Sequence, residues 1–168
     1  MSSPEKLIIE KLGKHHEKSR FVCGNDPLDN YIARQAGQDI KRNTNRVFVA
    51  VTPRQPNRII GYYSLSALSI ELLDLPSNVA KKLPRHPIPA ALMGRLAVSK
   101  DHQRNGVGRV LLADAVKRCI AASQEIAIYA LVVDPKDDDA SAFYKKFGLQ
   151  TMGAQTERLY LPLRTLNQ

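Results

Sequence analysis

The chain has 168 residues, 43% of them hydrophobic, and its 25 Lys and Arg against 16 Asp and Glu leave a formal net charge of +9. This length suits one domain with a single core, and the composition excludes an intrinsically disordered chain. No apolar run approaches the roughly 20 residues of a membrane span, and no signal peptide is recognisable, so we expect a cytoplasmic protein. The excess of positive charge either solvates the surface or indicates a polyanionic partner, a nucleic acid or a phosphate-rich cofactor.

The first half of the chain predicts strands around one helix. Residues 5–11 alternate weakly and predict an edge strand, and Asn25 or Asp26 can cap a helix that has Pro27 at its first position. Two β-branched or aromatic runs, 46–52 and 58–70, are separated by a turn and predict a hairpin. Four prolines in residues 75–89 predict a loop that holds one short helix.

The second half predicts a βαβ crossover beneath a mixed sheet. Strands are expected at 90–98, 126–134 and 158–163; the second is continuously apolar, which is typical of a central strand covered on both faces. The helix after residue 106 has one apolar face, formed by Leu111, Leu112, Ala115, Val116, Cys119 and Ile120, and turns Asp114, Lys117 and Arg118 to solvent. A last helix begins among the acids before Ala140 and ends at Gly148, a C-cap. We therefore expect a single α/β domain over residues 1–168, with a mixed sheet flanked by helices.

The sequence HQRNGVGRVLLADA, residues 102–115, has the composition of a phosphate-binding loop. A loop that joins a strand to a helix exposes N–H groups at the positive end of the helix. Gly106 and Gly108 remove side chains that would hold a ligand away from those groups, and Arg104 and Arg109 add positive charge. The P-loop lysine and the three glycines of a dinucleotide fingerprint are both missing, so this is a different kind of phosphate cradle.

Two blocks resemble the GNAT acyltransferase family. RLAVSKDHQRNGVGRVLLADA contains Gln103, Arg104, Asn105, Gly106, Val107 and Gly108, which fit the family's Q/R-x-x-G-x-G/A motif, and VVDPKDDDASAFYKKFGL resembles its last-helix motif, with Leu149 in place of the usual Phe. The resemblance implies a splayed mixed sheet and acetyl-CoA as the ligand. It also implies that the main chain of Leu96, Ala97 and Val98 pairs with the pantetheine arm, and that Arg109, Ala140 and Phe143 complete the cofactor site.

Further segments resemble one branch of this family, the GNAT toxins of type II toxin–antitoxin systems. FVCGNDPLDNYI, IIGYYSLS, LPRHPIPAALMGRLAVS and the region around Tyr144 carry this resemblance, which spans roughly residues 20–163. It implies acetylation of the α-amino group of aminoacyl-tRNA, a ribbon-helix-helix antitoxin and a homodimer. The segment DPKDDDA departs from the Asp-Ala that these toxins often carry before the last helix.

The chemistry agrees with an α-amine acceptor. An α-amine has a pKa near 7.7–8.0, against about 10.4 for lysine, so it needs little help from a base. The central strands offer no obvious buried acidic base, and Tyr144 is the expected general acid toward the departing thiolate. Residues expected to contact RNA phosphates are Arg95, Lys41, Arg42, Arg46, Lys81, Lys82 and Arg85.

Two other functions remain open on the sequence. One is a GNAT enzyme that acetylates a small amine or a protein N-terminus, with the charge serving only the cofactor. The other is an acyl-CoA-binding module without catalysis, which the presence of Tyr144 disfavours. No metal site is expected, because His15 and His16 are adjacent on a charged segment while the other two histidines fall in separate loops.

Overall fold

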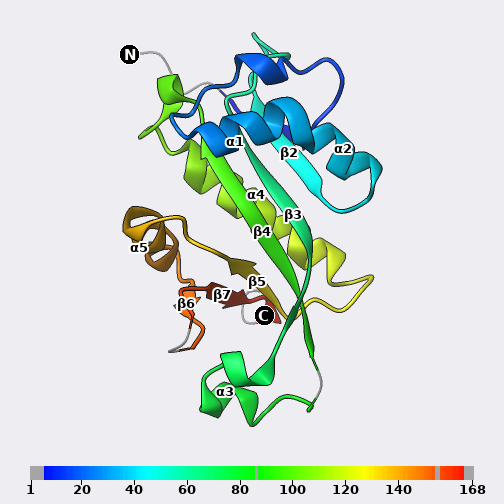
Figure 1. Ribbon diagram of the computed structural model, residues 1–168, viewed down its shortest axis with the longest axis vertical. Helices are drawn as coiled ribbons and strands as arrows, with labels where there is room; N and C mark the ends of the chain where they lie inside the picture. The colour runs from blue at the N-terminus through cyan, green and yellow to red at the C-terminus, as the bar shows by residue number, and fades with distance from the viewer. Residues whose placement is uncertain (1–5, 86, 154–155, 165–168) are drawn as a thin grey trace. The chain divides into compact units, whose positions relative to one another are not determined.

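The computed structural model describes residues 6–85, 87–153 and 156–164, and the chain forms two compact units. Unit 1 comprises Met1–Ser66 and Arg95–Ala115, and unit 2 comprises Ala67–Gly94 and Val116–Gln168. Strands β3 (Gly61–Ile70) and β4 (Ile88–Val98) and helix α4 (Val107–Ala122) contribute residues to both units. In the described part of the chain, seven strands follow the order β1-β2-β3-β4-β5-β7-β6 (Figure 1). Within the described residues, no helix has the length and apolar character needed to cross a membrane.

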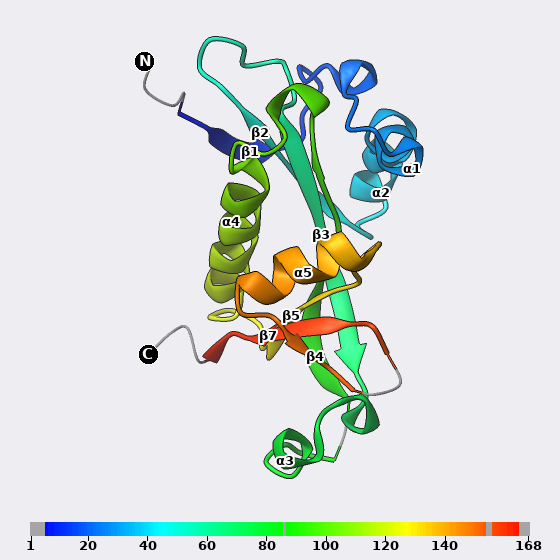
Figure 2. The same cartoon turned by 90° about the vertical axis from the view of Figure 1, so that its left-hand side faces the viewer.

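Unit 1 is built on the antiparallel strands β1 (Ile8–Lys11), β2 (Arg46–Val51) and the first half of β3. Its helical elements are η1 (Lys18–Arg20), α1 (Asp26–Asn30), η2 (Tyr31–Gln35), α2 (Ala36–Lys41) and η4 (Lys100–His102). Side chains alternate across β2: Val47, Val49 and Val51 pack with Tyr31 and Ile32 on the α1–α2 side. The start of α4 covers the other face of β2 and β3 (Figure 2). The loop that leads into α4 follows the end of β4 in this unit.

Unit 2 contains the crossover and the C-terminal strands. Strand β5 (Ala130–Val133) pairs in parallel with β4 and antiparallel with β7 (Leu159–Pro162), which also pairs with β6 (Gln150–Thr151). The remaining elements are η3 (Leu72–Asp74), α3 (Ser77–Ala80) and α5 (Asp138–Lys146). Every residue of β5 is buried, as expected for a central strand. The parallel β4–α4–β5 connection confirms the predicted crossover, and the mixed sheet with flanking helices confirms the predicted fold class.

Several boundaries differ from those expected. The strand expected over 126–134 is confined to β5, because the N–H of Ile126 still donates a hydrogen bond to the carbonyl of Ala122 at the end of α4, and Ile126 is 70% exposed. The two-residue strand β6 was missed, since so short a run carries no periodicity. The expected first helix contains a π-helical segment, η2, between two α-helical ones. The edge strand is confirmed as β1, although residue 5 of its expected range lies outside the described residues.

The side chain of Asp114 is also placed differently from the expectation. It was expected to face solvent, yet the hydroxyl of buried Tyr63 on β3 donates a hydrogen bond to its carboxylate at 2.6 Å. Tyr63 stacks in turn on Phe48 of β2, at 5.2 Å between ring centroids. A polar pair therefore joins the sheet to the first half of α4.

Candidate active site

The loop before α4 has the backbone of an anion-binding turn. Arg104 and Gly106 both have positive φ angles, 67° and 83°, so the chain turns sharply twice before the helix begins. The Gly106 carbonyl accepts a hydrogen bond from the N–H of Val110, and the first turn of a helix leaves N–H groups without intrahelical partners. A Cβ atom added at Gly106 would meet nothing within 4 Å, so this face of the loop is open. The geometry fits a phosphate group at the positive end of α4.

The side chain of Gln103 holds this loop to two other segments. Its Nε2 atom donates to the carbonyl of Val98 at 2.9 Å and to the carbonyl of Cys23 at 2.7 Å. The N–H of Lys100 donates to the carbonyl of Val22 at 2.9 Å, beside this contact. Gln103 was expected among the cofactor-binding residues; here its donor group is directed at the main chain, so it fixes the position of the cradle.

The end of β4 is held close to β3 and α4 by a glycine. A Cβ atom at Gly61 would lie 2.9 Å from the Ala97 carbonyl oxygen and 2.8 Å from a methyl group of Leu111, so only glycine allows this approach. Among the described residues, the register of β4 with β5 ends at the pair Met93–Val133. The segment Leu96–Val98 therefore continues beyond the part of β4 that pairs with β5.

Tyr144 lies on α5, in unit 2. Asp137 caps this helix by accepting a hydrogen bond from the N–H of Ala140 at 2.7 Å, which confirms the predicted acidic helix start. Tyr144 is 7% exposed and packs edge-to-face on Phe143 at 5.3 Å. Burial raises the pKa of its hydroxyl, and within the described residues this hydroxyl makes no hydrogen bond. It is therefore a protonated, unengaged donor at neutral pH.

The residues considered as bases do not offer a free buried carboxylate. Asp134, at the end of β5, is engaged by Arg158 through two contacts of 2.7 and 3.3 Å. Glu125 lies in the exposed turn after α4. Among the described residues, the buried polar side chains are His16, Thr52, Ser64 and Ser99, which include no Asp or Glu. The site is thus suited to an acceptor that needs little general-base assistance.

Arg95 is held by contacts that the sequence did not reveal. Its guanidinium carbon lies 3.5 Å from the centroid of the Tyr31 ring, and one nitrogen lies 3.5 Å from the Ser64 hydroxyl. The Tyr31 hydroxyl donates to Asp39 at 2.9 Å, and burial with this hydrogen bond raises its pKa to about 12. The π-helical segment η2 supplies Tyr31, and short π segments recur at functional sites. Arg95 is therefore a partly buried cation in a fixed orientation.

The other residues expected to bind RNA are exposed and fall into two groups. Lys41, Arg42 and Arg46 lie at the junction of α2 and β2 in unit 1, where Arg46 also contacts Asn43 at 2.5 Å. Lys81, Lys82 and Arg85 follow α3 in unit 2. The members of each group are neighbours in the sequence.

A cluster of Glu10, His15 and His16 has donor atoms within 4.8 Å of one another, a proximity that the sequence did not predict for Glu10. The buried His16 ring accepts a hydrogen bond from the N–H of Gly13 through Nδ1 at 2.9 Å. Its Nε2 therefore carries the hydrogen and donates to Glu10 at 2.8 Å, and this bond lowers the pKa of Glu10. With one ring nitrogen accepting from Gly13 and the other carrying hydrogen, His16 closes a turn and has no lone pair left for a metal.

Comparisons with known proteins show which family the chain is similar to. Residues 43–150 match the acetyltransferase (GNAT) domain. A tRNA-acetylating toxin of Mycobacterium tuberculosis is 34% identical over 143 residues, which cover 85% of this chain and 82% of the relative. A probable toxin TacT of Sinorhizobium fredii is 29% identical, with 96% and 93% covered.

Solved structures are similar over nearly the whole chain. A tyrosine-to-phenylalanine mutant of KacT has a TM-score of 0.91 at 26% identity, covering 97% of this chain and 98% of that one. AtaT complexed with acetyl-methionyl-tRNAfMet has a TM-score of 0.89 at 27% identity, covering 96% and 98%. AtaTR bound with acetyl-CoA has a TM-score of 0.83 at 27% identity, covering 96% of each chain. By its matched domain, its relatives and its fold, the chain belongs to the GNAT acetyltransferase family.

Proposed function

We propose that this protein is a toxin acetyltransferase that transfers an acetyl group from acetyl-CoA to the α-amino group of aminoacyl-tRNA and so blocks translation. The observation that carries the proposal is the open glycine turn at the start of α4, fixed by Gln103, in a chain similar to a tRNA-acetylating toxin. Residues 1–168 form one acetyltransferase domain in this proposal, with its two compact units joined by β3, β4 and α4.

The residues around the turn have the chemistry to hold acetyl-CoA. The amides of Gly106, Val107 and Gly108 and the side chains of Arg104, Asn105 and Arg109 suit a pyrophosphate group. The main chain of Leu96, Ala97 and Val98 is assigned to the pantetheine arm, with Ala140 and Phe143 as further contacts on α5. When bound, acetyl-CoA supplies an activated acetyl thioester.

Tyr144 is the proposed general acid. The neutral amine of the acceptor attacks the thioester carbonyl; the C–N bond forms, the C–S bond breaks, and the sulfur takes a proton from the Tyr144 hydroxyl. The raised pKa keeps this hydroxyl protonated at neutral pH. The attacking nitrogen loses its extra proton to solvent, and solvent returns a proton to the Tyr144 oxygen, which agrees with the lack of a buried carboxylate among the described residues. An N–H group at the end of β4, that of Val98 or a neighbour, polarises the carbonyl.

Charged tRNA suits the electrostatics of the chain. Arg95 and the exposed groups Lys41, Arg42 and Arg46, and Lys81, Lys82 and Arg85, are assigned to phosphate contacts that hold RNA without reading bases. A toxin of this kind requires a neutralising partner, for which we propose a ribbon-helix-helix antitoxin, and we propose a homodimer as its active form. A cytoplasmic location follows from this substrate.

The test is transfer of radiolabelled acetyl groups from acetyl-CoA to a pool of charged tRNAs. Label on the aminoacyl group, together with growth arrest when the protein is expressed alone, is the expected result. Transfer to small amines or protein N-termini without transfer to charged tRNA would replace this function with that of a general N-acetyltransferase. If the protein bound acetyl-CoA but transferred no acetyl group to any acceptor, it would be a regulatory module without catalysis.

A further inference from the structure

A cavity of about 390 Å³ in unit 1 lies beside the cradle loop and is not used by the proposed reaction. Its walls are Glu17, Arg20, Phe21, Val22, Arg58, Ile59, Ser99, Lys100 and Asp101. Ser99 and Lys100 directly follow β4, so one wall of the cavity is the segment that leads into Gln103 and the glycine turn. The cavity is large enough for a small ligand group.

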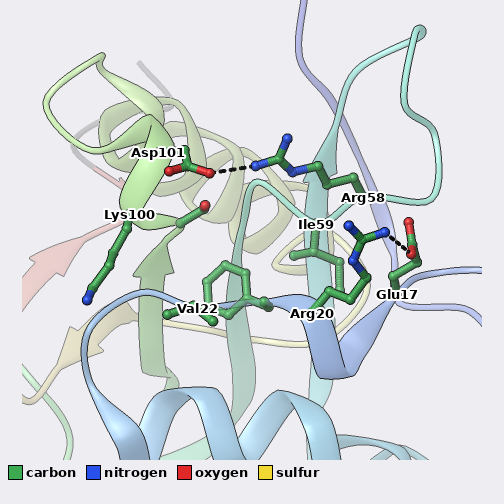
Figure 3. A pocket seen from close by; sticks show the side chains of 9 residues that line it. Glu17, Arg20, Val22, Arg58, Ile59, Lys100 and Asp101 are labelled. Carbon is green, nitrogen blue, oxygen red and sulfur yellow. Dashed lines mark hydrogen bonds and ion pairs between the residues drawn. The ribbon is translucent and has the colours of Figure 1, made fainter.

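Two arginines are fixed at this cavity by carboxylates. Arg20 Nη1 lies 2.8 Å from Glu17, and Arg58 Nη2 lies 2.8 Å from Asp101 (Figure 3). Each contact engages one nitrogen of a guanidinium that has five N–H donors, so both side chains keep donors for a further anion while their positions are set. Figure 3 shows Lys100 directed away from the two arginines.

Apolar side chains lie between the two ion pairs. Phe21 and Ile59 are buried, and Val22 is 50% exposed and lies between the arginines and Lys100 in Figure 3. The exposed Val22 and the guanidinium planes beside it offer a surface for the base of a nucleotide, while the arginines bind its phosphate. A ligand that carries only a carboxylate, with no flat ring, would leave the exposed Val22 side chain in water.

A second cavity of about 280 Å³ adjoins the first. It shares Glu17, Arg20 and Arg58 with it and adds Arg54 and the turn Gln55–Asn57 of the β2–β3 hairpin. The combined surface therefore carries three arginines and two carboxylates over a path longer than one ligand group. Successive phosphates of a polynucleotide match such a path better than a single anion does.

From these contacts we infer that the paired cavities form a subsite for nucleotide phosphates of the charged RNA, with Arg20, Arg54 and Arg58 as the contacting cations. This inference rests on the proposed function and names a contact surface distinct from the lysines and arginines assigned to phosphate contacts above. The 3′-phosphorylated adenosine of acetyl-CoA carries the same chemistry, so the experiment must separate the two sources.

The experiment compares the Arg20→Gln/Arg58→Gln protein with a charge-matched Lys117→Gln/Lys145→Gln control, whose two lysines are exposed on α4 and α5. The KM for charged tRNA should rise by about tenfold or more in the first protein, as expected for the loss of charge-assisted contacts, and stay near the wild-type value in the control. On a log–log plot against salt, the slope of RNA binding should fall by about 0.7 per lost contact. Circular dichroism and the unfolding midpoint verify that each variant folds.

Glu17→Gln supplies a variant with the opposite expected sign. It removes a negative charge and leaves Arg20 in place, so RNA binding should strengthen, whereas a purely structural role of the ion pair predicts no such gain. If the double variant fails to fold, this single substitution still decides the question.

Calorimetry with acetyl-CoA and with dephospho-CoA separates the two sources. An unchanged acetyl-CoA dissociation constant in the arginine variant assigns the subsite to RNA. A weakened acetyl-CoA affinity with unchanged dephospho-CoA affinity assigns it to the cofactor's phosphate instead. Wild-type KM and salt slope together with wild-type calorimetry would overturn the inference, while a lack of RNA acetylation by the wild-type protein would overturn the proposed function itself.

Discussion

The carboxamide of Gln103 donates a hydrogen bond back to the carbonyl of Val98, five residues earlier, at 2.9 Å. The same nitrogen reaches Cys23, just before α1, at 2.7 Å. The cradle loop is thereby closed on itself and tied to the N-terminal segment of unit 1. Gln103, which the motif assigns to the cofactor site, therefore makes contacts that position the main chain of the loop.

Replacing Gln103 with Met tests this positioning role. Met keeps the length of the side chain but donates no hydrogen bond, so the loop loses both ties and acetyl-CoA should bind roughly tenfold more weakly, about 1.4 kcal/mol. Isothermal titration calorimetry measures the affinity, with Gln38→Met on the exposed face of α2 as the matched control. Wild-type affinity in a folded Gln103→Met protein would show that the loop holds its shape without these bonds.

A Gly108→Val substitution tests the cradle. The added side chain in the first turn of α4 obstructs the approach of a phosphate to the helix amides, so the dissociation constant of acetyl-CoA should rise at least tenfold, about 1.4 kcal/mol. Gly37→Val is the control, because Gly37 is also helical and an added Cβ there meets only the Lys18 amine, at 3.9 Å. If calorimetry gave equal acetyl-CoA affinities for the two variants, the loop at Gly108 would not be the phosphate-binding site.

The Tyr144→Phe variant isolates the proposed general acid. Phe keeps the ring and its packing on Phe143 but lacks the phenol proton, so turnover should fall by about 10²–10⁴-fold with acetyl-CoA binding nearly intact. Growth arrest should disappear as well. Tyr129→Phe, a partly buried tyrosine in unit 2, should keep wild-type turnover. Full activity of Tyr144→Phe would leave a water molecule as the acid, and circular dichroism must show that the variant is folded.

The pH dependence follows from the direction of the Tyr144 shift. Burial raises its pKa above the usual value of about 10, so the hydroxyl remains a donor through neutral and mildly alkaline pH. The acceptor amine must be neutral, and its pKa lies at or below about 8. The value of kcat/KM should therefore rise between about pH 6 and 8 and stay level to about pH 9.5. A decline that begins near pH 8 would contradict a buried tyrosine acid.

The Tyr63–Asp114 hydrogen bond is expected to stabilise unit 1. A hydrogen bond from a buried hydroxyl to a carboxylate contributes about 1.5–3 kcal/mol, so Tyr63→Phe and Asp114→Ala should each lower the free energy of unfolding by an amount in this range. Guanidinium unfolding of the wild type, both single variants and the double variant gives the coupling energy between the two side chains. This difference excludes the contributions of each residue's other contacts. Additive effects would mean that the bond contributes nothing to stability.

Local patterns in the sequence were sufficient to predict the hairpin and the crossover. The short β-branched run 46–52 predicts β2 because such side chains favour strands, and the acids before Ala140 and Gly148 mark the start and end of α5 through helix-end chemistry. The paired glycines before Val110 predicted a phosphate loop because only a bare backbone exposes helix amides to a ligand. These signals lie within a few residues of one another, so no long-range contact is needed to read them.

Only the tertiary structure decided which polar side chains are engaged. The sequence placed Asp114 in solvent, whereas the folded chain brings Tyr63 to it across 51 residues. The hydrogen bond from Gln103 to Cys23 likewise joins segments 80 residues apart. The stacking of Arg95 on Tyr31 and the arginine-lined cavities around Arg58 also join segments far apart in sequence. The physical reason is that a side-chain hydrogen bond or ion pair depends on separations of a few ångströms, which periodicity along a chain does not encode.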